Sequence, residues 1–165
     1  MNPPDKVMMG FEENKRVVKI MKNHPVEDVF NGRVCYFRSK LEHRWAKYLQ
    51  ILLESGQIAG WFYEPDKFIF PDEITAPVQY TPDFKVIEND GTVIYQETKG
   101  YHDGQTNTKL RRMAKHYPDT IFELVLQRIP KKGKGAARQR IAAKYTRRII
   151  DASKIFRQIG VYSQG

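Results

Sequence analysis

The chain contains a single cysteine, Cys35, which excludes an internal disulfide and which we expect in the core. It lacks an apolar run of the roughly 20 residues that a membrane-spanning helix needs. Its first residues lack the apolar stretch of a secretory signal peptide. No internal repeat, zinc-ligand pair or glycine-rich phosphate loop is visible in the sequence. These absences favour a protein of a reducing cytoplasm, with no membrane contact.

Acidic residues are scarce in the last third of the chain. From residue 109 onward, 15 Lys and Arg stand against 3 Asp and Glu, whereas residues 1–108 carry 13 against 16. With a formal net charge of +9, the 165-residue chain favours a polyanionic partner; the alternative is a basic protein without a specific partner. We expect one domain with extensions, divided into an N-terminal extension over residues 1–30, a core over 31–129 and a basic segment over 130–165.

Two segments that are rich in β-branched and aromatic residues also carry charges. Residues 78–88 and 92–99 are predicted as strands. The first contains Asp83 in the sequence Thr-Pro-Asp-Phe, and the second ends with Glu97 and Lys99 in the sequence Glu-Thr-Lys-Gly. Charges on such strands predict a functional site, because a half-buried strand face does not normally carry them.

The turn between these strands sets their register. If residues 89–91 form a three-residue loop with its glycine in the left-handed conformation, Glu88 faces Thr92. Counting back places Asp83 directly opposite Glu97, with Lys99 on the same face as Glu97. A two-residue loop would instead send Asp83 to the other face of the hairpin.

Opposed carboxylates repel each other, and a divalent cation would remove that cost. Two carboxylates completed by water suit Mg²⁺, and Mn²⁺ is expected to substitute for it. Lys99 beside them could orient or deprotonate a water molecule, or stabilise a pentavalent phosphate. The alternative is a solvent-facing hairpin in which Lys99 forms ion pairs with Asp83 and Glu97.

A helix upstream carries a further acid. Ser39 and Glu42 fit a capping box at its start, and Gly56 fits its end. Apolar residues follow at near-helical spacing, at Leu41, Trp45, Leu49 and Leu52. Capping is the first interpretation of Glu42, and a turn of its carboxylate towards a metal-bound water is the second.

Taken in order, Ser39-x-x-Glu42, Pro82-Asp83 and Glu97-Thr98-Lys99 resemble the PD-(D/E)xK nuclease superfamily. Over roughly residues 32–128 the chain is most similar to small phage-encoded endonucleases of that superfamily. It is similar, more distantly, to Holliday junction resolvases and to the end-cleaving endonucleases of certain transposons. The resemblance implies an α/β, restriction-endonuclease-like core with a mixed central sheet flanked by helices, here followed by a basic C-terminal helical extension.

The resemblance also implies roles for the residues. Asp83 and Glu97 would be metal ligands, joined by the Thr98 carbonyl and by Glu42, which would bind the metal or its water shell. Lys99 would position the attacking water. The activity implied is a Mg²⁺-dependent endodeoxyribonuclease that hydrolyses phosphodiester bonds, with branched DNA or Holliday junctions as candidate substrates.

Such an enzyme would act in phage recombination or DNA processing, in the cytoplasm of a bacterial host cell. Symmetric cutting of two strands is compatible with a homodimer. One alternative is a non-catalytic nucleic-acid-binding module with a nuclease-like fold. Another is a transposon end-cleaving subunit that needs phage or transposition partner proteins.

Basic residues gather in two further segments. A helix is predicted from Thr108 to Tyr117, and a flexible hinge over residues 131–135 leads into a helix predicted from Ala136 to Phe156. We expect both to contact DNA phosphates; the alternatives are a solvated face for the first helix, and a membrane surface or a partner helix for the second. The candidate DNA-binding residues are Lys109, Arg111, Arg112, Lys115, Lys131, Lys132, Lys134, Arg138, Arg140 and Lys144. The polar loop over residues 101–108, including His102, is expected to be exposed.

Overall fold

The computed structural model describes residues 25–160. A frayed start over residues 1–10 and a short helix over 12–22, both suggested by the sequence, lie outside the described residues. The described residues divide into two compact units, 25–43 and 44–160.

The first unit contains an antiparallel hairpin of β1 (Val26–Phe30) and β2 (Arg33–Phe37). Its turn is Asn31-Gly32, with φ angles of 50° and 76°. The expected division of the chain at residue 31 therefore falls inside this hairpin. Cys35 is half-buried rather than a core residue, and both of its neighbours on β2, Val34 and Tyr36, are exposed.

Helix α2 (Lys40–Glu54) begins as the sequence predicts. The Glu42 N–H donates to the Ser39 hydroxyl at 3.1 Å, and that hydroxyl donates to Glu42 Oε1 at 3.1 Å. Glu42 Oε2 accepts from the Arg38 N–H at 2.8 Å. This is the predicted capping box. Gly56 follows the helix with a φ of +70°, a conformation that favours glycine.

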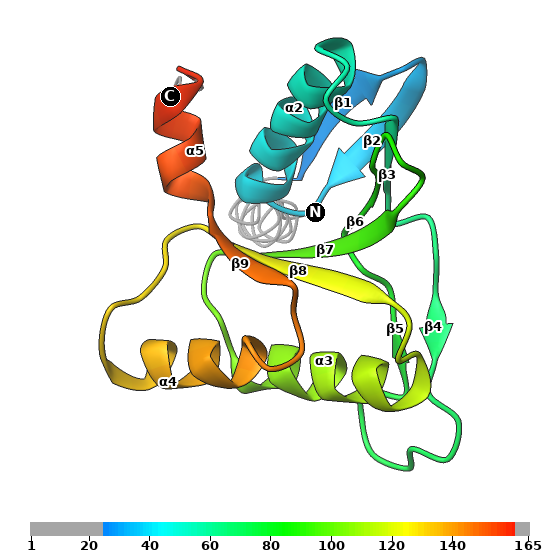
Figure 1. Ribbon diagram of the computed structural model, residues 1–165, viewed down its shortest axis with the longest axis vertical. Coiled ribbons are helices and arrows are strands. Elements are labelled where there is room, and N and C mark those ends of the chain that lie inside the picture. Colours follow the sequence, from blue (N-terminus) through cyan, green and yellow to red (C-terminus); the bar gives the residue numbers. More distant parts are fainter. Residues whose placement is uncertain (1–24, 161–165) are drawn as a thin grey trace, which may run out of the picture. The chain divides into compact units, whose positions relative to one another are not determined.

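The second unit is built on a mixed five-stranded sheet, so the α/β class with a mixed central sheet is confirmed (Figure 1). The strand order is β3-β6-β7-β8-β9, with antiparallel pairing from β3 to β7 and parallel pairing from β7 to β9. The strands are β3 (Gly60–Tyr63), β6 (Phe84–Ile87), β7 (Val93–Lys99), β8 (Ile121–Leu126) and β9 (Arg148–Asp151).

The β6–β7 hairpin has the predicted register. Phe84 pairs with Gln96, and the Glu88 N–H donates to the Thr92 carbonyl at 2.9 Å. Gly91 has a φ of +86° and closes the loop. Extending the pairing by one residue beyond Phe84 places Asp83 beside Glu97.

The prediction of one continuous strand over residues 78–88 is wrong. Residues 81–83 separate β6 from β5 (Gln79–Tyr80), which instead pairs with β4 (Phe68–Ile69) in a small sheet. Pro82 lies in this break, since a proline cannot donate to a strand ladder.

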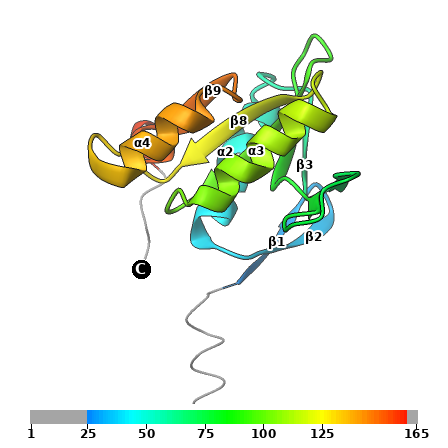
Figure 2. The ribbon, with the colours of Figure 1, turned by 90° about the horizontal axis from the view of Figure 1, so that it is seen from below.

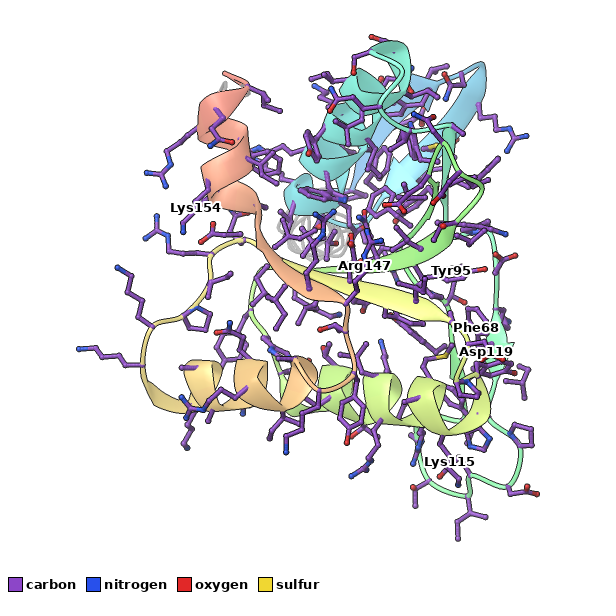
Figure 3. The ribbon with its side chains drawn as sticks, in the orientation of Figure 1. Phe68, Tyr95, Lys115, Asp119, Arg147 and Lys154 are labelled. Atoms are coloured by element: carbon purple, nitrogen blue, oxygen red, sulfur yellow. The ribbon has the colours of Figure 1, made fainter. Side chains whose placement is uncertain are left out.

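Helices cover both faces of the central sheet. Helices α3 (Gly104–His116) and α4 (Gly133–Ala142) lie side by side along one face (Figures 1 and 2). Helix α5 (Ala152–Gln158) lies on the opposite face, where the rings of Trp45 and Phe156 are 6.3 Å apart. The core under α3 and α4 is Phe70, Tyr80, Tyr95, Leu110, Met113, Phe122, Leu124, Leu126 and Ala142. At the margin of this core, the ring of Phe68 packs edge-on against the ring of Tyr95 (Figure 3).

The prediction of one helix from Ala136 to Phe156 is wrong, and with it the basic C-terminal helical extension. The segment forms most of α4, then β9, then most of α5. The predicted hinge glycines, Gly133 and Gly135, belong to the first turn of α4. β-branched Ile149 and Ile150 instead pair beside β8.

No helix within residues 25–160 is long and apolar enough to cross a membrane.

Candidate active site

Glu97 is the centre of the candidate site. It lies near the C-terminal end of β7 and is 2% exposed. Its Oε2 accepts from the Tyr80 hydroxyl at 2.8 Å. Its Oε1 lies 3.0 Å from the Lys99 ammonium and 3.7 Å from the Lys109 ammonium. A carboxylate this deeply buried needs such partners, because its desolvation is otherwise costly.

Asp83 is held beside it, directly before β6, and is 3% exposed. Its Oδ2 accepts from both the backbone N–H and the hydroxyl of Thr98, each at 2.8 Å. Its carbonyl accepts from the Glu64 N–H at 2.8 Å. Thr98 therefore fixes the Asp83 carboxylate. The sequence does not predict this role, because the two residues meet only where β6 and β7 pair.

The charges of both acids act on Lys99. Burial favours the neutral amine, but the charges of Glu97 and Asp83 and the hydrogen bond to Glu97 outweigh it, so the pKa of Lys99 is raised. Lys99 is therefore protonated at neutral pH and acts as a hydrogen-bond donor. The same two acids also act on Tyr80, whose hydroxyl pKa is raised well above its usual value by burial and then by Glu97 and Asp83. Both carboxylates thus act on the same two side chains.

Tyr80 and Lys109 belong to this site, and sequence reasoning assigned neither of them to it. Tyr80 enters it from the small β4–β5 sheet, and Lys109 enters it from α3. The Lys109 ammonium also lies 5.0 Å from the centre of the Tyr80 ring.

The start of α3 differs from the prediction. The Asp103 side chain accepts from the Thr106 N–H at 3.0 Å and caps the helix, so most of the predicted loop over residues 101–108 is helical. His102 is buried rather than exposed, with Nε2 2.9 Å from the Asn107 side-chain oxygen. Arg138 of α4 covers this segment and donates to the His102 carbonyl at 3.2 Å.

Glu42, the fourth predicted catalytic residue, belongs to the first unit. Its carboxylate takes part in the capping box of α2 with Ser39 and Arg38. The second unit itself brings together Asp83, Glu97, Thr98 and Lys99.

The donor set fits a hard divalent cation held through few protein ligands. No group of three or more His, Cys, Asp or Glu side chains that could hold a metal occurs within residues 25–160. Mg²⁺, however, is commonly bound by one or two carboxylates, with water and substrate phosphate completing its shell. Asp83 and Glu97 are the residues that would hold it, because both are buried acids at adjacent strand ends.

The predicted DNA-binding residues fall into two groups. Some form contacts within the protein: Lys109 with Glu97, Lys115 with Glu73, and Arg138 with Tyr101. The others are exposed and form no ion pair within residues 25–160; they are Arg111, Lys131, Lys132, Lys134, Arg140 and Lys144.

Arg112 was expected on the exposed face of its helix, and this is wrong. It is buried and donates to the carbonyls of Thr75 and Pro77, while Glu73 accepts from its guanidinium at 3.3 Å. It anchors the loop between β4 and β5, which carries Tyr80 at its end.

The free basic residues begin beside the site. Exposed Arg128 opens a run that continues through Lys131, Lys132 and Lys134 after β8. The Gln127 N–H, just before this run, donates to the Lys99 carbonyl at 2.9 Å. The run therefore leaves the sheet next to the residues that surround Glu97.

Comparison with known proteins found no matching family model, no matching curated protein and no matching solved structure.

Proposed function

We propose that this protein is a metal-dependent DNA endonuclease of the PD-(D/E)xK type, with a restriction-endonuclease-like core. The observation that carries the proposal is the pair of buried acids, Asp83 and Glu97, that the β6–β7 register places opposite each other. The Lys99 ammonium lies 3.0 Å from Glu97 Oε1, and the charges of both acids raise its pKa. Buried acids grouped with a lysine in this way are typical of functional sites rather than of a solvated hairpin.

In this proposal each residue has a stated task. Asp83 and Glu97 hold Mg²⁺, together with the Thr98 carbonyl. When bound, Mg²⁺ supplies an activated water and neutralises charge on the phosphate. Lys99 is protonated, so it orients that water or donates to a phosphate oxygen rather than removing a proton. Thr98 keeps Asp83 in place through its two hydrogen bonds.

DNA is the proposed substrate because unpaired cations begin beside the site. The run from Arg128 to Lys134, together with Arg140 and Lys144 on and just after α4, offers charges that no acid within residues 25–160 neutralises. Phosphate contacts of this kind fix the position of DNA without reading its sequence. We further propose that the substrate is branched DNA processed during phage recombination. A homodimer would cut the two strands.

Cleavage of supercoiled plasmid and of a synthetic four-way junction, each with Mg²⁺ and with Mn²⁺, tests the proposal. The unaltered protein should cut at least one of these substrates. Asp83→Asn, Glu97→Gln and Lys99→Met should each lower the rate by about a hundredfold or more. All three should still bind DNA in Ca²⁺.

Lys154→Met and Asp119→Asn are matched controls, because Lys154 lies on α5, on the other face of the sheet from α3, and Asp119 follows the C-terminal end of α3 (Figure 3). Both should cut like the unaltered protein. Equal cutting by Asp83→Asn would indicate a contaminating nuclease. DNA binding by the unaltered protein without cutting, in every metal and substrate, would refute the enzyme and favour a non-catalytic binding module.

A further inference from the structure

Lys109 reaches the candidate site from a different element than the other charged residues. It projects from the second turn of α3, and its ammonium lies 3.7 Å from Glu97 Oε1. Lys99 contacts the same oxygen at 3.0 Å. Two ammonium groups therefore share one carboxylate oxygen, an arrangement that like-charge repulsion opposes.

The contact differs from those of the other basic residues on α3. The Lys109 side chain is 25% exposed, and its ammonium lies over the Tyr80 ring, whereas the Lys115 side chain is 62% exposed and pairs with Glu73. Lys109 is thus built into the site, and Lys115 is a surface residue.

The surrounding charges support two cations at this place. Asp103, the cap of α3, is near both lysines. Burial raises the pKa of its carboxyl, but the hydrogen bonds from Thr106 and the charges of Lys99 and Lys109 lower it by more, so this pKa lies below its usual value. The charges of Glu97 and Asp83 also act on Lys99. The lysines are therefore balanced by acids, and any cation that binds Glu97 must compete with them.

We propose that Lys109 is a second phosphate-binding lysine of the cleavage site, held by Glu97 in the resting protein and released to a non-bridging phosphate oxygen when Glu97 binds a divalent cation. This inference rests on the proposed function. It involves an exchange of ion pairs only, and no covalent bond is made or broken by Lys109.

The exchange predicts effects of opposite sign on two measurements. In Lys109→Met the aliphatic stem stays against Tyr80, but the ammonium is lost. Mn²⁺ binding without DNA, measured by titration calorimetry, should tighten by about tenfold. This is the scale expected for removing one charge about 5 Å from a doubly charged ion in a water-like dielectric. The cleavage rate at saturating Mn²⁺ should fall by about tenfold to a hundredfold, as for the loss of one transition-state donor.

Lys109→Arg keeps the charge and should retain near-normal Mn²⁺ affinity with partial cleavage. Lys154→Met, which removes an exposed ammonium on α5, should leave both quantities unchanged. Lys109→Gln provides a second neutral variant, should the methionine variant fail to fold.

Tighter Mn²⁺ binding together with slower cleavage supports the inference. Any other combination in a folded neutral variant overturns it, including weaker Mn²⁺ binding with slower cleavage, which a merely structural role would give. If the unaltered protein neither binds Mn²⁺ nor cuts, the proposed function fails and the inference fails with it. If the unaltered protein does both and the variant matches it, only the inference fails.

Discussion

Glu123 offers the sharpest test of the fold, because it joins β8 to the strand that the sequence did not predict. It is fully buried, and its Oε1 lies 2.7 Å from Nη2 of Arg147 and 2.7 Å from Nε of Arg148. Its Oε2 accepts from the Gln96 side chain at 2.8 Å. Arg147 stands at the start of β9 (Figure 3), so this carboxylate holds β9 to the sheet from inside.

The substitution Glu123→Gln keeps the shape of the side chain and removes its charge. Removing one partner of a buried ion pair costs about 3–5 kcal/mol. The lower end applies here, because the side chains of Arg147 and Arg148 are 37% and 60% exposed and remain hydrated. We expect a loss of about 3 kcal/mol in the free energy of unfolding. At about 2–4 °C per kcal/mol for a chain of this size, the melting temperature should fall by about 6–12 °C.

Urea denaturation measures the loss, and amide hydrogen exchange locates it. The amides of β9 should exchange faster in the variant. Glu88→Gln is the matched control, because it also removes a partner of Arg147, but from a pair in which both side chains are about one-third exposed. That control should cost at most about 1 kcal/mol. A Glu123→Gln protein no less stable than Glu88→Gln would refute the reasoning.

Two further predictions concern residues near the site. Arg112→Met should lower the free energy of unfolding by about 2–4 kcal/mol and speed amide exchange in the loop over residues 71–78, because the guanidinium donates to two carbonyls there. The DNA affinity of this variant should change by less than about twofold. A large loss of affinity would show that Arg112 contacts DNA after all. Burial is the main cause that lowers the pKa of His102 below its usual 6.5. Its contribution to stability is therefore complete above pH 6.5 and is lost as the pH falls from there through the lower folded-state pKa. Urea unfolding between pH 8 and pH 5 should show a steeper decline for the unaltered protein than for His102→Gln; parallel curves would contradict the assignment.

The sequence predicted what depends on local chemistry. Ser39 and Glu42 define the start of α2 because a capping box needs only four residues. The loop that ends at Gly91 defines the β6–β7 register, because a three-residue turn fixes the pairing of its strands. Asp83 could be placed beside Glu97 for that reason.

The features that the sequence did not predict depend on contacts between distant segments of the chain. Ile149 and Ile150 are compatible with a basic amphipathic helix, and only their pairing with β8 makes them a strand. Tyr80 and Lys109 reach Glu97 from a separate small sheet and from a helix. No spacing along the chain relates these three residues, so sequence reasoning left them out of the site.

The position of β9 at one margin of the sheet changes what the minimal folding unit must contain. A shortened chain ending at residue 129, the expected limit of the core, would leave β8 with an unpaired row of backbone groups and Glu123 with a buried charge lacking its two arginines. Bare strand margins recruit strands from other molecules, so such a fragment would aggregate rather than remain a smaller folded protein. Strand β9 is thus as much a part of the architecture of the second unit as the strands beside the acids.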